Sequence, residues 1–279
     1  MSAKYVCLKP KEQTSRVIFN SPHSGRIYDV SFLRKSVLDL KKLRSSEDAF
    51  VDEIIKPVSS MGCISLAANF PRCFLDLNRN PEDLDNKLIS GFEHKNTNSR
   101  ILAGLGVIPR VVSDGNPIYE SKISMDEVNF RLKNYYFPYH LILKNILQST
   151  KEKFGNTILL DFHSMPRAAL KTFSTDKKYL PEIVLGDCYG SSCNSWLMDK
   201  VYDFFSSAGF RVEKNIPFAG GFITKNYGKP LKNVQALQIE IDRSIYMDEK
   251  DYALHEGFKE LNGKIKGVLL LLSKLTNPG

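Results

Sequence analysis

The sequence predicts an α/β fold of three layers, in which helices cover both faces of a mixed, mostly parallel central sheet. The first observation is that apolar runs of strand length alternate along the chain with segments whose apolar residues recur every three or four positions. The second is that several of these runs end abruptly in polar side chains, as strands do where an α/β sheet binds its ligands. Candidate site residues are therefore expected at the carboxyl ends of the strands.

Length and composition predict a single globular domain spanning residues 1–279. The chain is 42% hydrophobic and 25% charged, which is enough to bury one large core. It contains no repeat, low-complexity segment or long linker. No run approaches the roughly 20 apolar residues of a membrane span, and the amino terminus has no apolar stretch of signal-peptide length. We expect a cytoplasmic protein without membrane contacts.

The net charge fits a small anionic substrate as well as a nucleic-acid surface, and no nucleic-acid partner is expected. The formal net charge is +8, but the 39 lysines and arginines are scattered among 31 acidic residues, and only short pairs of them cluster. The five cysteines include no CxxC pair and no zinc-finger spacing. They are expected to be reduced thiols.

The first half of the chain contains four expected strands and one helix. The run "RVIFNSPHSG" (residues 16–25) predicts a strand ended by turn-forming residues. After it the pattern turns helical, with Ser45 or Ser46 as the cap, which places Glu47 and Asp48 in the first turn. The three further strands are expected at residues 62–70, 72–79 and 107–112.

The second half alternates strands and helices more regularly. A capping box of Ser124 and Glu127 starts a long helix whose apolar repeat continues to Ile146, and Pro138 is a point at which this helix can kink. Asp248 is expected to cap a terminal helix. Strands are expected at residues 158–166, 182–187, 210–215 and 234–242, a helix at 196–205, and the buried side of the terminal helix at Leu254, Phe258, Leu261, Ile265 and Val268.

Two histidines lie at the ends of expected strands, and a carboxylate lies at an expected helix start. His23 follows the first strand, and His163 ends the apolar run of "ILLDFHSMP". Together with Glu47 or Asp48 they supply the three N/O ligands typical of a catalytic zinc site with an open water position. Taken alone, His163 fits a hydrogen-bonded histidine at a strand end equally well.

The stretch "FLDLNRNP" crowds polar groups onto the end of an apolar run. The Arg79 guanidinium can hold a substrate carboxylate in a bidentate pair, with the Asn78 amide as a further donor. The alternative is a turn in which Arg79 pairs with Asp76. Arg72 and Arg110 follow the same logic, since either can bind a second carboxylate or bridge to an acidic neighbour.

Glu240 stands between two isoleucines on the last expected strand, "VQALQIEID". Burial there raises the pKa of a carboxyl toward the value that a general base needs. The alternative is an internal ion pair with Arg243 or Lys225. Upstream, "PFAGGFITKNYG" has paired glycines and ends in Tyr227 and a glycine, as expected of a loop that approaches a ligand closely, although an ordinary hairpin has the same composition.

Seven motifs in the same order resemble the N-formylglutamate amidohydrolase family. They are "NSPHSG", "SEDAFVDEI", "FPRCFLDLNRNPEDLD", "GLGVIPRV", "LLDFHSMP", "PFAGGFITKNYG" and "LQIEIDRSIYMDE", and the resemblance covers residues 16–249. Through "DLNRNP" and the order His, His, Glu, the chain is also distantly similar to zinc carboxypeptidases. The resemblance therefore implies a zinc-carboxypeptidase-like fold.

The family resemblance implies hydrolysis of N-formyl-L-glutamate to formate and L-glutamate, a step of histidine degradation. It also implies zinc, or another divalent metal, bound by His23 and His163. The carboxypeptidase motif has a glutamate three residues after its first histidine, whereas Arg26 occupies that position here. The third ligand is therefore expected elsewhere, at Asp48, with Glu47 as the alternative.

The resemblance also implies the roles of the remaining residues. Asn78 and Arg79 would hold one substrate carboxylate, and Glu240 would be the general base. Formylglutamate has a second carboxylate, for which Arg72 or Arg110 is expected to supply the cation, and Tyr227 is expected among the substrate contacts. The runner-up function is an amidase or deacylase for another N-acyl acidic amino acid or a short peptide. A non-catalytic protein that binds dicarboxylates or nucleic acid is the least favoured.

Overall fold

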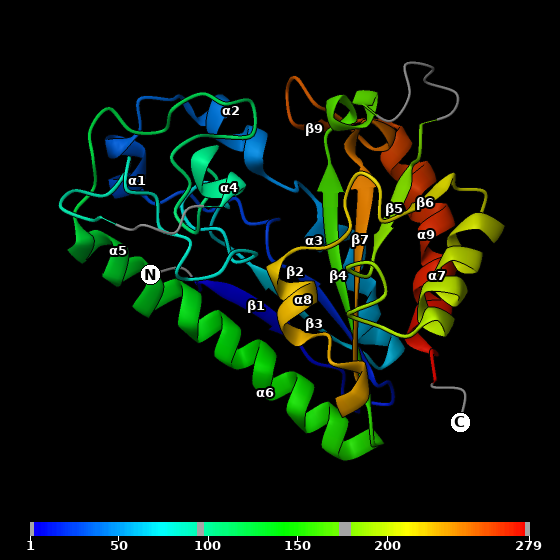
Figure 1. Ribbon diagram of the computed structural model, residues 1–279. Coiled ribbons are helices and arrows are strands. Elements are labelled where there is room, and N and C mark those ends of the chain that lie inside the picture. The colour runs from blue at the N-terminus through cyan, green and yellow to red at the C-terminus, as the bar shows by residue number, and fades with distance from the viewer. Residues whose placement is uncertain (1–2, 94–97, 173–179, 277–279) are drawn as a thin grey trace.

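A seven-stranded sheet of order β1-β3-β2-β4-β7-β5-β6 forms the centre of the computed structural model, which describes residues 3–93, 98–172 and 180–276 (Figure 1). β1 is antiparallel to β3 and β5 is antiparallel to β7, whereas the other neighbours are parallel. The strands are β1 (Tyr5–Leu8), β2 (Val17–Ser21), β3 (Ile64–Ala68), β4 (Thr157–Met165), β5 (Ile183–Gly186), β6 (Val212–Lys214) and β7 (Val234–Asp242). A separate ribbon pairs β8 (Met247–Asp248) with β9 (Ala253–Leu254).

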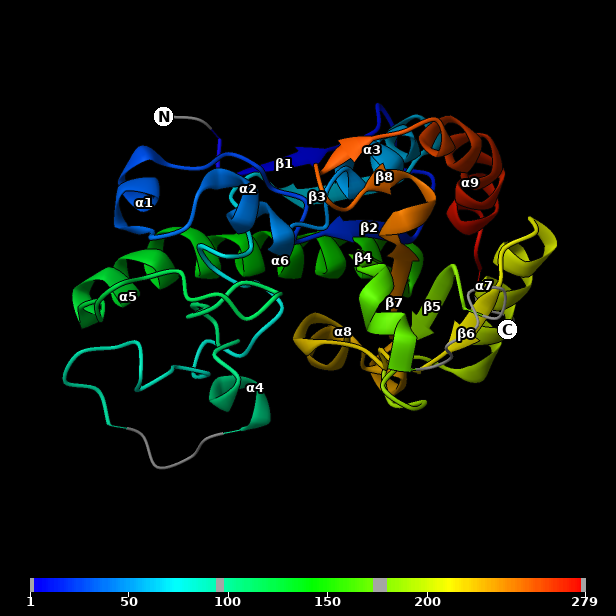
Figure 2. The ribbon, with the colours of Figure 1, turned by 90° about the horizontal axis from the view of Figure 1, so that it is seen from above.

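Helices cover both faces of this sheet (Figures 1 and 2). On β4, Ile158, Leu160 and Phe162 pack toward α3, α7 and α9, whereas Leu159 packs toward α6. The predicted three-layer arrangement around a mixed, mostly parallel sheet is confirmed. The α-helices are α1 (Val30–Lys35), α2 (Leu40–Leu43), α3 (Val51–Ile55), α4 (Ser99–Leu102), α5 (Met125–Arg131), α6 (Phe137–Phe154), α7 (Ser195–Ser207), α8 (Phe222–Tyr227) and α9 (Gly257–Ser273).

The central strands are those that the sequence predicts best. All nine residues of β4 are buried. A parallel strand that is covered on both faces needs apolar residues along its whole length, so its sequence is a continuous apolar run. Ser124 accepts a hydrogen bond from the Glu127 N–H and caps α5, as expected. A π-helical segment, Leu132–Tyr136, then joins α5 to α6 just before Pro138. None of the helices in the described parts of the chain is long and apolar enough to cross a membrane.

Two expected strands, at residues 72–79 and 107–112, are loops. The chain turns after Pro71, whose carbonyl accepts the Phe74 N–H (3.0 Å), and the Asp76 N–H then donates to the Val107 carbonyl (2.8 Å). The two segments therefore contact one another outside the central sheet. Their apolar side chains, Leu75 and Val107 among them, are buried without strand geometry, which is why their composition resembles that of strands.

The helix expected from Ser46 begins at Val51, so neither Ser45 nor Ser46 caps it. Both serines lie in a 3-10 turn, Arg44–Ser46. Glu47 and Asp48 consequently precede the helix instead of forming its first turn. The Asp48 N–H donates to the His23 carbonyl (3.0 Å), and this bond holds the segment beside the end of β2.

The terminal helix also begins later than expected. Asp248 lies in β8, where its carboxylate accepts the Lys250 N–H (2.7 Å), and α9 starts at Gly257 with Glu256 at the N-cap position. Leu254 lies in β9 and is 40% exposed, so it is not part of the buried helix face. Of the other expected positions, Leu261, Ile265 and Val268 are buried and Phe258 is partly buried against the same core.

Candidate metal centre and substrate cavity

A cavity of about 510 Å³ opens at the carboxyl ends of the parallel strands. His23 reaches it from just beyond β2, His163 from near the end of β4, and Glu240 from near the end of β7. His163 and Glu240 are paired residues of β4 and β7. The expected edge of the sheet therefore carries these three residues.

His23, Asp48 and His163 form a buried cluster whose ligand atoms all lie within 4.8 Å of one another. The Asp48 Oδ2 atom lies 3.0 Å from His163 Nδ1 and 3.4 Å from His23 Nδ1. Glu47 turns away, since its carboxylate accepts the Tyr28 hydroxyl (2.6 Å) and pairs with Arg44 (3.1 Å). The structure thus selects Asp48 over Glu47 as the carboxylate that faces the histidines.

A second carboxylate stands behind each histidine. His23 Nε2 is hydrogen-bonded to Asp76 Oδ1 at 2.8 Å, and His163 Nε2 lies 3.0 Å from Asp161 Oδ2. Such outer partners fix the orientation of metal-ligating imidazoles. His23 Nδ1 is left buried without a hydrogen-bond partner among the described residues. A buried nitrogen acceptor beside a carboxylate oxygen and a second imidazole nitrogen fits a divalent metal.

The protonation tendencies of the cluster agree with this fit. Burial favours the neutral form of Asp48, but hydrogen bonds with His163 and His23 hold its pKa well below the usual value. Burial favours neutral His163, but the neighbouring Asp161 and Asp48 carboxylates raise its pKa well above the usual value. The carboxylates around His163 therefore stabilise positive charge at this position, whether a proton on the ring or a metal ion supplies it.

Glu240 has the properties of a buried acid-base group. Burial raises its pKa to about 7, and the nearby Asp48 carboxylate acts in the same direction, whereas His163 lowers it. The Gln238 side chain donates to its Oε1 atom (3.0 Å), and the described residues form no ion pair with it. Arg243, one of its expected partners, instead pairs with Asp48. A carboxyl group that titrates near neutrality can accept and return a proton at physiological pH.

Asn78, Arg79 and Arg72 line the cavity beside this cluster. Arg72 pairs with Asp76 Oδ2 (2.9 Å), and Arg79 donates to the carbonyls of Leu105 (2.9 Å) and Asn78 (2.8 Å). The Arg79 Nη2 atom is 3.6 Å from Asp76 Oδ2, so the expected turn and ion pair are present. Arg79 lies at the cavity wall as well, so the two sequence interpretations of this residue are compatible.

The Asn78 side chain is fixed from both sides. Its Oδ1 atom accepts the Ile223 N–H (2.7 Å), and its Nδ2 atom lies 3.4 Å from His163 Nε2. The segment 217–228 therefore closes over Asn78 as a loop followed by α8 and is not a hairpin. A Cβ on Gly221 would lie 2.2 Å from Asn78 Nδ2, so this close approach requires a glycine.

Two expected substrate contacts, Arg110 and Tyr227, are directed elsewhere. Arg110 is neutralised by Asp85 (2.8 Å), and the Tyr227 hydroxyl lies 2.9 Å from His140 Nδ1 and donates to the His140 carbonyl. Neither residue lines the cavity around the candidate metal centre within the described ranges. Both expectations rested on neighbours in sequence, and the side-chain directions correct them.

The sequence interpretation missed two arginines that line the cavity, Arg100 and Arg243. Arg243 is 4% exposed and donates from Nη2 to Asp48 Oδ1 (3.0 Å) and from Nε to Ser164 Oγ (3.1 Å). Its position directly after β7, three residues beyond Glu240, was the available signal. Arg100 lies on the short helix α4 and had no distinguishing local pattern.

The comparisons with known proteins agree on one family. The model of the family described as N-formylglutamate amidohydrolase matches residues 15–247. The chain is 29% identical over 239 residues to the N-formylglutamate deformylase of Pseudomonas putida, and over 237 residues to that of Pseudomonas aeruginosa; in each case 84% of this chain and 83% of the relative are covered. The crystal structure of N-formylglutamate amidohydrolase from Ralstonia eutropha JMP134 superposes with a TM-score of 0.91 at 31% identity and 98% coverage of both chains.

Proposed function

Because the chain belongs to the N-formylglutamate amidohydrolase family, we propose that it hydrolyses the amide bond of N-formyl-L-glutamate to formate and L-glutamate. The observation that carries this proposal is the joint position of three groups in one cavity. A His/Asp/His cluster stands beside a carboxyl group with a pKa of about 7, and both face a wall of arginines. These groups suit, respectively, a metal, a proton transfer and an anionic substrate.

The residues that would hold the metal are His23 and His163 through Nδ1 and Asp48 through Oδ2. A set of two imidazoles and one carboxylate is typical of catalytic zinc, so we propose zinc as the divalent ion. When bound, the metal would polarise the formyl carbonyl and lower the pKa of a water molecule at that position. Asp76 and Asp161 would keep the Nε2 side of each ring fixed.

Glu240 would serve as the general base and then as the general acid. Its carboxylate would accept a proton from the attacking water and return it to the amide nitrogen as the C–N bond breaks, so the reaction consumes one water and leaves the enzyme unchanged. The pKa of about 7 suits both transfers. Asn78 and Arg79 would hold a substrate carboxylate, and Arg72 would place a positive charge near the developing oxyanion.

The test is formate release from N-formyl-L-glutamate, with N-acetyl-L-glutamate as the competing substrate. We expect activity that is lost on chelation, restored by zinc, and clearly higher for the formyl compound. Preference for the acetyl compound would support the runner-up function, a deacylase for another N-acyl acidic amino acid. Absence of hydrolysis of both compounds by zinc-loaded protein would reject the proposal.

A further inference from the structure

The arginines around the cavity differ in what they already bind. Of the four that line it, Arg72 is paired with Asp76 (2.9 Å) and Arg243 with Asp48 (3.0 Å). Arg79 donates to two backbone carbonyls and lies 3.6 Å from Asp76. The Arg100 guanidinium, by contrast, makes no hydrogen bond or ion pair with any described residue. Among the four arginines that line this cavity, Arg100 is therefore the one whose charge no described residue neutralises, so it can bind an anionic ligand.

The backbone holds Arg100 close to Arg79. Asn98 caps α4 by accepting the N–H of Arg100 (3.0 Å) and of Ile101 (3.0 Å). The Arg100 carbonyl accepts the Leu105 N–H (2.8 Å), and the Leu105 carbonyl in turn accepts Arg79 Nε (2.9 Å). Burial lowers the pKa of Arg79 to about 10, and the Arg100 charge contributes in the same direction. An anion bound between the two guanidinium groups would reduce the repulsion between their charges.

The two arginines stand where the first cavity meets a second one of about 540 Å³. The cavities share Arg79, Arg100, Asn78 and the Gly220 and Gly221 backbone. Lys225 and Lys229 also line the second cavity, and Asp83 is the acidic side chain on its wall. The junction therefore extends away from the metal centre and is mainly cationic.

The chemistry of the substrate assigns its two carboxylates to different places. In an N-formyl amino acid the α-carboxylate is attached two bonds from the amide nitrogen, whereas a glutamate side-chain carboxylate is attached two carbons further along. Asn78 and Arg79 line the same cavity as His23, Asp48 and His163. The Asn78 N–H donates to Asp76 Oδ1 (2.8 Å), the atom that is also hydrogen-bonded to His23 (2.8 Å). Asn78 and Arg79 are therefore placed for the α-carboxylate, and a cation farther along the wall is needed for the side chain.

We propose that Arg100 binds the side-chain carboxylate of the substrate and thereby selects N-formyl derivatives of acidic amino acids. This inference rests on the proposed function and specifies the residue that sets substrate class. Arg110, expected from the sequence for a second carboxylate, is already neutralised by Asp85. A planar guanidinium without a partner can bind a carboxylate through two parallel hydrogen bonds.

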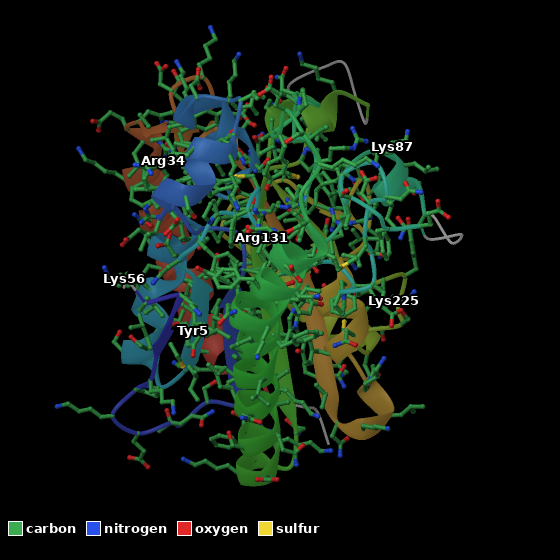
Figure 3. All side chains as sticks on the ribbon, turned by 90° about the vertical axis from the view of Figure 1, so that its left-hand side faces the viewer. Tyr5, Arg34, Lys56, Lys87, Arg131 and Lys225 are labelled. Carbon is green, nitrogen blue, oxygen red and sulfur yellow. The ribbon has the colours of Figure 1, made fainter. Side chains whose placement is uncertain are left out.

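The experiment compares N-formyl-L-glutamate with N-formyl-L-glutamine, which has the same length but a neutral side chain. The variants are Arg100→Ala, Arg100→Lys and, as a matched control, Arg34→Ala on α1 (Figure 3), an exposed arginine that lines neither cavity. We expect Arg100→Ala to lower kcat/KM for formylglutamate by about 10-fold to 100-fold, mainly through KM, and to leave that for formylglutamine within about twofold. Arg100→Lys should restore part of the loss, and Arg34→Ala should keep the wild-type ratio.

Equal losses on both compounds, or an unchanged ratio, would overturn the assignment of Arg100. Failure of the proposed function is distinguishable, because wild-type protein would then release formate from neither compound. In that case, calorimetric titration of zinc-loaded protein with each compound replaces the kinetics. A wild-type preference for formylglutamate that Arg100→Ala abolishes supports carboxylate binding by Arg100, and equal affinities overturn it.

Discussion

Replacing Asp76 with asparagine changes the support of one candidate metal ligand without changing the ligand itself. In the wild-type protein Asp76 is 2% exposed. Its Oδ1 atom is hydrogen-bonded to His23 Nε2 (2.8 Å), and its Oδ2 atom forms an ion pair with Arg72 Nε (2.9 Å). An asparagine has one oxygen and one NH₂ group. If the oxygen keeps its bond with His23, the NH₂ group must face the Arg72 guanidinium, and two donors then meet. The contact with Arg72 is therefore lost, or, if the amide turns over, the Oδ1 contacts with His23 and with the Asn78 N–H (2.8 Å) are lost instead.

The expected effect is weaker zinc binding. Removing an outer partner of a metal-ligating histidine costs about 10-fold to 100-fold in metal affinity, which corresponds to about 1.4 to 2.7 kcal/mol. The Asp76→Asn loss should fall near the lower end, because the side chain keeps its shape and one acceptor. Asp76→Ala leaves the buried His23 Nε2 without this acceptor and should fall near the upper end.

Competition with a chromophoric zinc chelator at fixed pH measures this effect directly. The matched control is Asp199→Asn on α7, where the wild-type carboxylate is 63% exposed and pairs with Lys214 far from the cavity. Circular dichroism establishes that each variant is folded. Zinc affinities of both Asp76 variants within about twofold of wild type would refute the argument that Asp76 fixes the His23 ring for metal binding.

Three further changes test the base, a buried histidine and the core. Glu240→Gln should lower kcat for N-formyl-L-glutamate by about 10²-fold to 10⁴-fold while the zinc content stays at the wild-type level. The control is Glu260→Gln, because the Glu260 side chain is 70% exposed on α9. An unchanged rate for Glu240→Gln would remove Glu240 from the mechanism. Burial lowers the pKa of His140 to about 4, although its bond to the Leu77 carbonyl opposes this. The fold therefore favours the neutral ring. Relative to its value above pH 6.5, the contribution of His140 to the free energy of unfolding should fall by about 3 kcal/mol at most as the pH decreases toward 4. In urea unfolding, the stability of wild type relative to His140→Gln should decline over this interval, and a constant difference contradicts the assignment. Leu237 in β7 is 0% exposed, so Leu237→Ala should lower the free energy of unfolding by about 2 to 5 kcal/mol. Leu270 is 43% exposed, so Leu270→Ala should lower it only slightly. Equal losses for the two variants would contradict the burial of Leu237 in the core.

The central strands and the polar residues that end them could be predicted from local sequence patterns. β2, β4 and β7 are read correctly because strands buried on both faces need continuous apolar runs. His23, His163 and Glu240 follow from these runs, since a polar side chain that ends or interrupts one is conspicuous. Parallel pairing then brings the carboxyl ends of the strands to one edge, so the convergence of these residues was also predictable.

The parts of the site that come from loops depend on tertiary contacts and could not be predicted from local patterns. Residues 72–79 and 107–112 are apolar because they are buried, and their backbones bond to each other outside the sheet, which no local period distinguishes from a strand. The choice of Asp48 over Glu47 depends on the directions of two adjacent side chains, and these are set by Tyr28, Arg44 and the two histidines. Likewise, the Asp85 carboxylate neutralises Arg110, whereas Arg100 reaches the cavity wall unpaired among the described residues. All three outcomes depend on contacts between segments that are far apart in the chain. Hydrophobic periodicity is a local pattern, so it does not predict such contacts.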